Sequence, residues 1–302
     1  MLRSRHAKIT RHPSPYVFRR AVLRWYESNG RDLPWRRTRD PWLVLMSEVM
    51  LQQTQVGRVI PKYETFVRRW PTPAAMAKAR LADVLKEWSG LGYNRRAAHL
   101  KEAAGAIVAT CDGSMPEGRE ALEALPGVGR YTARAVASFA YNTDSALWDT
   151  NVRRIALRFF FGGEFAANAA DDEALEKTLE AALPKGRSRD WHGALMDFGS
   201  AVCLGRAPKC GACPLARTCL ASPSFLSGRM PKRRLVRPQT RFEGSRRQAR
   251  GAVIRLLAGA GRGGMDRVEA VRRLGRADSQ DVIDALADEG LVVRRGRRIM
   301  LP

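Results

Sequence analysis

Hydrophobic positions recur at intervals of three and four residues through most of the chain, and this spacing predicts amphipathic helices. Stretches of this kind are PYVFRRAVLRWYESN from residue 15, LADVLKEWSGLG from 81, RRAAHLKEAAGAIVAT from 95 and DDEALEKTLEAALP from 171. Proline and glycine separate the stretches, and no run of alternating apolar and polar residues precedes residue 290. The chain is therefore predicted to be mainly α-helical.

The pattern changes after residue 222, where a basic, proline-containing segment follows. We predict a basic tail, a helical core, a basic linker and a C-terminal module over residues 1–14, 15–222, 223–244 and 245–302, respectively. The module has three helical stretches and a short hairpin that turns at Gly296; the stretches span 247–257, 265–274 and 279–289. This order is typical of a small winged-helix-like fold.

The charge of the chain indicates what it binds. Its 302 residues carry a formal charge of +23, which makes a polyanion the expected partner, with nucleic acid first and a membrane surface second. No apolar run approaches the ~18 residues of a membrane span, and the N-terminal stretch has no apolar core of the signal-peptide kind. We therefore expect a soluble, intracellular protein that does not enter membranes.

Four of the five cysteines lie close together in CLGRAPKCGACPLARTC, at Cys203, Cys210, Cys213 and Cys219. In a cytosolic protein such a group is typical of a metal site, because four thiolates in one short loop can surround a cationic centre. Zinc and an iron–sulfur cluster both fit. Zinc sites more often contain two C-x2-C pairs and this loop has one, so the spacing favours a [4Fe–4S] cluster. The remaining Cys111 is expected to be a small buried hydrophobe.

Two carboxylates stand in opposed surroundings. Glu48 lies in the apolar run LMSEVML, which favours its neutral form, whereas Asp149 stands where an apolar run ends and a helix begins. The simplest role for Asp149 is an N-cap, which is compatible with a second role as a fixed anion. Glu48 would then donate a proton while Asp149 stabilises a positive charge. Cleavage of a glycosidic bond through an oxocarbenium-like transition state needs both.

A further motif, LPGVGRYTARAV, contains Gly127, Val128 and Gly129 between two helical stretches. This is the arrangement of a helix–hairpin–helix, whose exposed backbone N–H groups bind a DNA phosphate at the N-terminus of the second helix. Taken without its context, the GVG triplet is equally typical of an ordinary glycine-rich connection between helices.

Five stretches, taken in order, closely resemble the adenine DNA glycosylases of the endonuclease III superfamily, the MutY type. They are LPWRRTRDPWLVLMSEVMLQQTQVGRVIPKY, GLGYNRRAAHL, LPGVGRYTARAV, DTNVRRI and the cysteine loop, and the resemblance covers residues 15–222. It implies a two-lobed helix–hairpin–helix glycosylase fold in which the first helix joins the later chain to form the lobe with the [4Fe–4S] cluster. It also implies a cytoplasmic monomer that associates with the nucleoid by binding double-stranded DNA and removes adenine mispaired with 8-oxoguanine or guanine.

The resemblance implies roles for individual residues. Glu48 would protonate the adenine ring and Asp149 would stabilise the sugar cation, with Tyr131 and Asn151 assisting. Tyr131 stands where bifunctional relatives have a lysine nucleophile, so a monofunctional enzyme without Schiff-base chemistry is expected. The other matched positions are an active-site arginine, a residue inserted near the estranged base and a wedge at the DNA stack, respectively Arg36, Gln53 and Tyr93.

The chain departs from the family at two points. Thr150 follows the catalytic Asp where many relatives have Gly, and too few residues follow the linker for the usual nudix-like domain that inspects 8-oxoguanine. Recognition of the opposite base is therefore expected to rest on the core or on the C-terminal module. The alternatives are a thymine or uracil glycosylase for G:T or G:U pairs, and a non-catalytic iron–sulfur protein that binds DNA. SEVMLQQTQV favours adenine, and a binding protein would leave Glu48 without a purpose.

The C-terminal module is expected to contact DNA through its hairpin. Its third helical stretch carries four acids that phosphate would repel, whereas four arginines crowd the turn, at Arg294, Arg295, Arg297 and Arg298. We therefore predict that the hairpin and the basic linker contact the phosphate backbone of DNA.

Overall fold

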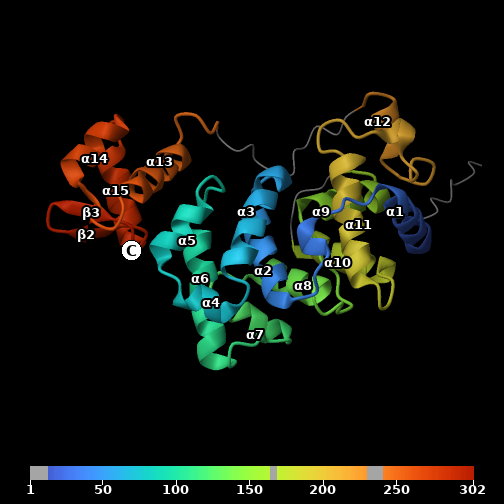
Figure 1. The fold of residues 1–302 in the computed structure, drawn as a ribbon. Helices are drawn as coiled ribbons and strands as arrows, with labels where there is room; N and C mark the ends of the chain where they lie inside the picture. Colours follow the sequence, from blue (N-terminus) through green and yellow to red (C-terminus); the bar gives the residue numbers. More distant parts are fainter. Residues whose placement is uncertain (1–12, 164–168, 230–240) are drawn as a thin grey trace, which may run out of the picture. The chain divides into compact units, whose positions relative to one another are not determined.

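A computed structural model describes residues 13–163, 169–229 and 241–302 (Figure 1). Most of this part of the chain is helical, as the periodicity predicts. Residues 1–12 of the predicted tail and 230–240 of the predicted linker lie outside the described residues. Within the described ranges, no helix combines the length and the apolar character that crossing a membrane requires.

The chain forms two compact units, and each is built from two separate segments. Unit 1 comprises Met1–Arg31 and Asn142–Arg237, and unit 2 comprises Asp32–Tyr141 and Pro238–Pro302. The N-terminal helix therefore belongs to the unit that carries the cysteine loop, as the family resemblance implies.

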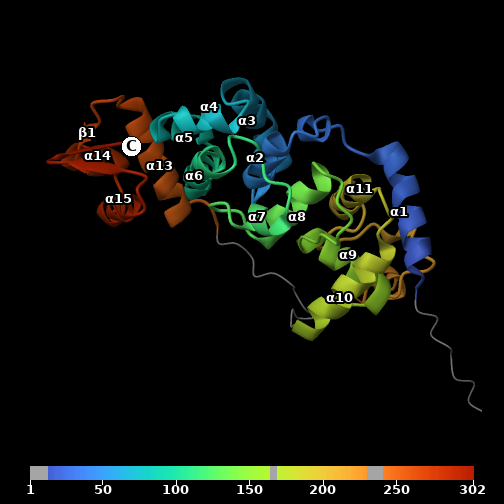
Figure 2. The same cartoon turned by 90° about the horizontal axis from the view of Figure 1, so that it is seen from below.

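Unit 1 is a bundle of helices. Its elements are α1 (Pro15–Asn29), α9 (Thr150–Phe161), α10 (Ala169–Ala182), α11 (Ser188–Ala201), η2 (Cys210–Ala212) and α12 (Ser222–Leu226). Helix α1 lies along α11, far later in the sequence (Figure 2). The fully buried Phe18 of α1 packs its ring 4.8 Å from that of Phe159 and 5.5 Å from that of Trp191, measured between centroids. This aromatic cluster fixes α1 to the bundle.

The helical lobe of unit 2 surrounds one central helix. Its elements are η1 (Pro34–Arg36), α2 (Pro41–Leu51), α3 (Val56–Arg69), α4 (Pro73–Lys78), α5 (Leu81–Trp88), α6 (Arg95–Thr110), α7 (Arg119–Glu123) and α8 (Arg130–Phe139). Asp40 begins α2 by accepting the N–H groups of Trp42 and Leu43 at 2.8 and 3.3 Å. Because α2 is apolar on nearly every face, it is buried and packs against α3, α6 and α8.

The C-terminal module completes unit 2. Its elements are α13 (Arg246–Gly259), β1 (Met265–Asp266), α14 (Arg267–Leu274), α15 (Ser279–Asp288), β2 (Val293–Arg295) and β3 (Arg298–Met300). The strands form an antiparallel sheet in the order β1-β3-β2, in which Ile299 pairs with both Met265 and Arg294. The predicted helix start at residue 265 is wrong, because Asp266 caps α14 and the extended chain before it pairs with β3.

Three of the four hairpin arginines are bound within the module. Arg294 forms an ion pair with Asp284 of α15 at 2.6 Å, and Arg298 donates to the carbonyl oxygens of Gly263 and Gly264 at 2.8 and 2.9 Å. These bonds hold the hairpin against its neighbours. Arg297 forms a longer ion pair with Asp266, at 3.6 Å, and its side chain is 87% exposed. Arg295 is exposed as well, so these two are the better placed of the four for the DNA contacts that the sequence predicts.

Candidate active site

The structure confirms the predicted burial of Glu48. The residue lies on α2 with 6% of its surface exposed, between the buried Leu45 and Val49. Helix α2 packs against α8, whose first turn carries the half-buried Tyr131. Removal from water disfavours the charged form of a carboxyl group. The carboxyl group of Glu48 is largely withdrawn from solvent.

Asp149 is the N-cap of α9, as the sequence predicts. Its Oδ1 accepts the backbone N–H groups of Asn151 and Val152, both at 2.8 Å. Its Oδ2 accepts the side-chain amide of Asn151, also at 2.8 Å. These three donors fix the carboxylate at the positive end of the helix dipole. Thr150 is exposed, so its side chain extends away from the packed side of this turn.

A chain of hydrogen bonds connects Asp149 with the cysteine loop, and it passes through a residue that sequence reasoning missed. Arg154 donates from Nη2 to Oδ1 of Asn151 at 2.9 Å and from Nε to the carbonyl oxygen of Cys203 at 2.9 Å. Gly199 permits the close approach, because a Cβ there would lie 2.8 Å from the Cβ of Asn151. The sequence contained one indication of this contact: Arg154 follows Asn151 by three residues, so the two side chains share one face of the helix.

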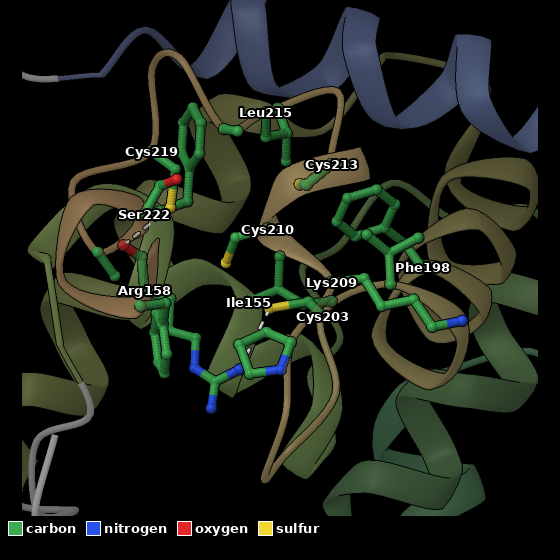
Figure 3. Close-up of a pocket in the computed structure, with 16 residues that line it drawn as sticks. Ile155, Arg158, Phe198, Cys203, Lys209, Cys210, Cys213, Leu215, Cys219 and Ser222 are labelled. Carbon is green, nitrogen blue, oxygen red and sulfur yellow. Dashed lines mark hydrogen bonds between the residues drawn. The ribbon is translucent and has the colours of Figure 1, made fainter. Parts of the chain in front are cut away.

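The four clustered cysteines line a single pocket in unit 1 (Figure 3). Burial raises the pKa of the Cys213 thiol to about 11 and also raises the pKa values of Cys210 and Cys219. Buried thiols keep their protons, whereas a cationic centre binds them as thiolates. Within the described residues, no three metal-binding side chains are grouped as they would be around one ion.

The rest of the pocket wall is mostly apolar, and its polar members are Arg158, Lys209 and Ser222. The hydroxyl of Ser222 is buried and has no hydrogen-bond partner among the described residues. Arg158, only 3% exposed, donates to the carbonyl oxygens of Leu204 and Gly205 at 2.7 and 2.8 Å. It also lies 3.5 Å from the Sγ of Cys203. Sequence reasoning missed Arg158, although an arginine within the apolar run IALRFFF was a signal.

The GVG motif forms a hairpin between α7 and α8. Gly127 has φ of 73°, and a Cβ there would lie 2.5 Å from the Cβ of His99, so only glycine fits. Val128 is buried in the core of unit 2, and Gly129 is the N-cap of α8. The backbone N–H groups of the first turn of α8 therefore follow the hairpin, as a phosphate site of this type requires.

Gln53 and Tyr93 lie at the tips of two loops and share an unusual backbone conformation. Their φ values are 54° and 47°, which non-glycine residues seldom adopt. Both side chains are exposed. Backbone strain of this kind is maintained only where the surroundings hold it, and Arg96 supplies that support.

Arg96 connects the two loops and was not identified from the sequence. It donates to the carbonyl oxygens of Val49, Met50 and Gln52 at 2.7 to 3.0 Å. It also donates to Thr54 Oγ1 at 3.0 Å and to the carbonyl oxygens of Leu91 and Gly92 at 3.2 and 3.1 Å. Burial lowers the pKa of Arg96 to about 10, and the guanidinium remains charged at neutral pH.

The structure thus distributes the candidate residues over both units. Unit 2 holds Glu48, Tyr131, Gln53, Tyr93 and the hairpin, together with Arg36, which is half-buried at the end of η1. Unit 1 holds Asp149, Asn151 and the cysteine loop. Cys111 is half-buried at the edge of the unit 2 core rather than fully buried, and its Sγ lies 3.4 Å from Thr110 Oγ1.

A buried histidine supports the segment that leads to Asp149. His192 accepts the N–H of Leu147 at Nε2 over 3.1 Å, and its Nδ1 lies 3.2 Å from Ser188 Oγ. Burial lowers the pKa of His192 from 6.5 to about 4, although the backbone of Ser188 and the charge of Asp144 act in the opposite direction. The neutral ring is therefore part of the folded structure at neutral pH.

We predict that His192 makes the protein less stable in mild acid. The unfolded chain binds a proton at this residue below its ordinary pKa of 6.5, whereas the folded protein binds it near pH 4. The contribution of neutral His192 to the free energy of unfolding is complete above pH 6.5. It is lost as the pH falls toward 4, by about 3 kcal/mol in total. Urea unfolding between pH 4 and 7 measures it. In His192→Gln, the free energy of unfolding should decline less steeply as the pH falls. His99→Gln leaves His192 intact and should show the same pH dependence as the native protein. An equal pH dependence in all three proteins would contradict the assignment.

Comparison with known proteins places this geometry in a class. The HhH-GPD superfamily of base excision DNA repair proteins matches residues 46–185. The adenine DNA glycosylase of Mycolicibacterium smegmatis is 42% identical over 241 residues, which is 78% of either chain. That of Mycobacterium tuberculosis is 40% identical over 240 residues, covering 79% of this chain and 78% of the relative.

Solved structures agree with the fold. A thermostable thymine-DNA glycosylase superposes with a TM-score of 0.64 at 32% identity, over 70% of this chain and 97% of that chain. Endonuclease III in a non-covalent complex with DNA superposes with a TM-score of 0.61 at 24% identity, over 70% and 95% of the two chains. The mainly helical fold of the endonuclease III type is confirmed. The chain belongs to the adenine DNA glycosylase family of the HhH-GPD superfamily of base excision DNA repair proteins.

Proposed function

We propose that this protein is an adenine DNA glycosylase, a hydrolase that breaks the N-glycosidic bond of adenine mispaired with 8-oxoguanine or guanine in double-stranded DNA. The observation that carries the proposal is the contrast between two acids. Glu48 is buried in an apolar helix, whereas Asp149 is fixed by three N–H donors at a helix N-terminus. Relatives at 40% and 42% identity carry the name adenine DNA glycosylase.

The two acids divide the chemistry of bond cleavage. The target adenine leaves the base stack, because the glycosidic bond is inaccessible inside the duplex. Glu48 donates its proton to a ring nitrogen of the base, which makes adenine a better leaving group. Asp149 then faces the positive charge that develops on the sugar, while Asn151 holds its carboxylate in place. Water completes the hydrolysis.

Tyr131 makes the enzyme monofunctional. It occupies the first turn of α8, after the hairpin, where a lysine would form a Schiff base with the sugar. A phenol cannot form that bond, so the reaction stops at an abasic site. Sodium borohydride should therefore trap no covalent complex with DNA.

The remaining candidate residues bind DNA. The backbone N–H groups around Gly127, Val128 and Gly129 bind a phosphate at the N-terminus of α8. Gln53 and Tyr93, exposed on strained loops, enter the space left by the flipped base and contact the estranged partner. Arg36 contributes a charge near the target base. We propose that the protein does this as a monomer.

The cysteine pocket holds a [4Fe–4S] cluster in this proposal, ligated by Cys203, Cys210, Cys213 and Cys219. Three observations support it: four cysteines around one pocket, a mostly apolar wall, and the buried hydroxyl of Ser222, which could donate a hydrogen bond to a cluster sulfide. When bound, the cluster supplies four iron–thiolate bonds that shape the loop. The loop in turn offers the exposed Arg206 and Lys209 to DNA.

The substrate is tested with a panel of duplexes that contain A opposite 8-oxoguanine, A opposite G, T opposite G, or U opposite G. We expect adenine to be released from the first two under single-turnover conditions. A pyrimidine offers Glu48 no equivalent ring nitrogen on its exposed edge, so thymine and uracil should remain.

One similar structure is a thymine-DNA glycosylase, so the panel decides between two named activities. Release of thymine or uracil with adenine untouched would establish the alternative. A protein that binds every duplex and releases no base would be a non-catalytic DNA-binding protein.

A further inference from the structure

The C-terminal module is packed directly onto the helical lobe of unit 2. Helix α13 contacts α5, and the two helices contribute to one hydrophobic core. The buried residues of this core include Val253 and Leu257 on α13 and Leu85 and Trp88 on α5. The backbone N–H at the start of α5 donates to the carbonyl oxygen of Pro302 at 2.9 Å. The module is thus held in a defined position against α5, and the loop that carries Tyr93 follows this helix.

This packing brings Arg247, near the N-terminus of α13, to Tyr93. Nη1 of Arg247 donates to the phenol oxygen of Tyr93 at 3.2 Å, and the guanidinium carbon lies 6.0 Å from the ring centroid. The guanidinium carbon of Arg96 lies 5.5 Å from the same centroid. Two guanidinium groups, one from the lobe and one from the module, therefore contact a ring that is 38% exposed.

The surface beside this contact is basic. Arg246 on α13 and Arg95 on α6 are exposed. Two acids near Arg246 are already paired: Glu289 forms a two-bond ion pair with Arg250 at 2.6 and 2.8 Å, and Asp278 pairs with Arg276 at 2.8 Å. The Arg250 partner lowers the pKa of Glu289, and the charges of Arg95 and Arg246 lower it further. Arginines from the lobe and from the module thus lie close together, and such a surface suits a phosphate backbone.

We infer that Arg247 is a positioning residue for Tyr93, through which the C-terminal module takes part in recognising the base opposite adenine. The inference rests on the proposed function, in which Tyr93 contacts the estranged base. A tyrosine held in one orientation before DNA arrives loses less conformational freedom when it enters the stack. Its contact with the opposite base then depends on geometry that the module fixes.

The test is a double-mutant cycle of Arg247→Ala and Tyr93→Phe in the full-length protein. The readout is the ratio of single-turnover excision rates for A opposite 8-oxoguanine and A opposite guanine. Both duplexes carry the same phosphates, so a general loss of electrostatic DNA binding cancels in this ratio. Deleting the module is unsuitable, because it would expose the apolar side of α5.

We expect Arg247→Ala to lower the ratio by about fivefold, the scale of one hydrogen bond from a charged donor at a partly exposed site. Tyr93→Phe removes the acceptor and should have a similar effect. The double variant should resemble either single variant, because both remove the same bond. Arg255→Ala removes an equal charge from the exposed side of α13 and should retain the native ratio.

Three results would overturn the inference: an unchanged ratio in Arg247→Ala, additive losses in the double variant, or an equal loss in Arg255→Ala. Thermal melting identifies any variant that is poorly folded. For such a variant, Arg247→Lys keeps the charge and a donor, and it should retain more of the ratio than Arg247→Gln if the contact matters. Failure of the native protein to release adenine would instead reject the proposed function, so the two failures are distinguishable.

Discussion

The Glu48→Gln variant should bind a duplex with A opposite 8-oxoguanine as the native protein does and release adenine about 10³-fold more slowly, a loss within the range for general acid catalysis. The amide has the shape of the acid, so the packing of α2 is retained, but it cannot transfer a proton to the base. Binding is measured by fluorescence anisotropy and excision by single-turnover kinetics.

The matched control is Glu102→Gln. Glu102 is exposed on α6 in the same unit, and its replacement is the same change of a carboxyl group to an amide. It should leave excision unchanged. Glu48→Gln with more than a tenth of the native rate would exclude Glu48 as the proton donor. If both variants lose activity together, the loss does not report proton transfer by Glu48.

Replacement of Cys210 by Ala should remove the cluster and much of the stability of unit 1. The purified native protein should be yellow-brown with about four irons per chain, the content of one [4Fe–4S] cluster, whereas Cys210→Ala should contain little or none. Because metal binding contributes directly to folding, thermal melting should occur at a lower temperature. Affinity for DNA should fall as well, since the pocket shapes the loop that carries Arg206 and Lys209.

The fifth cysteine provides the control for this experiment. Cys111 lies in unit 2 beside Thr110 and is not one of the residues that line the pocket. Cys111→Ala should therefore keep the native iron content and colour. One equivalent of zinc in the native protein, without the absorbance of iron–thiolate bonds, would contradict the cluster assignment.

Local features of the structure could be predicted from the sequence. Helix α6 spans Arg95–Thr110, the stretch that the periodicity marks, because an amphipathic face and its ends are encoded within a few turns. Asp149 was predicted to be an N-cap for the same reason, since its partners are the next two or three backbone N–H groups. The burial of Glu48 followed from a run of apolar neighbours.

Features that depend on distant parts of the chain could not be predicted. Arg154 bonds to the carbonyl oxygen of Cys203, and Arg96 collects carbonyl oxygens from the turn after α2, more than forty residues earlier. Backbone acceptors have no sequence signature, so an arginine that binds them resembles one that faces solvent. The partners of Arg294 and Arg298 were missed in the same way, because a cluster of arginines in sequence suggests an exposed charge. The contact of Arg247 with Tyr93 spans 154 residues.

The discontinuous construction of unit 1 has a consequence for synthesis of the chain on the ribosome. Helix α1 emerges first, but α11, against which it packs, follows more than 150 residues later. At translation rates of about 5–20 residues per second, the apolar side of α1 remains uncovered by α11 for roughly ten seconds or longer. The helices from α2 to α8 are contiguous and can fold during that interval. Phe18 and Val22 are therefore exposed to non-native association early in synthesis, and chaperones that bind apolar segments should recognise the nascent chain at this helix.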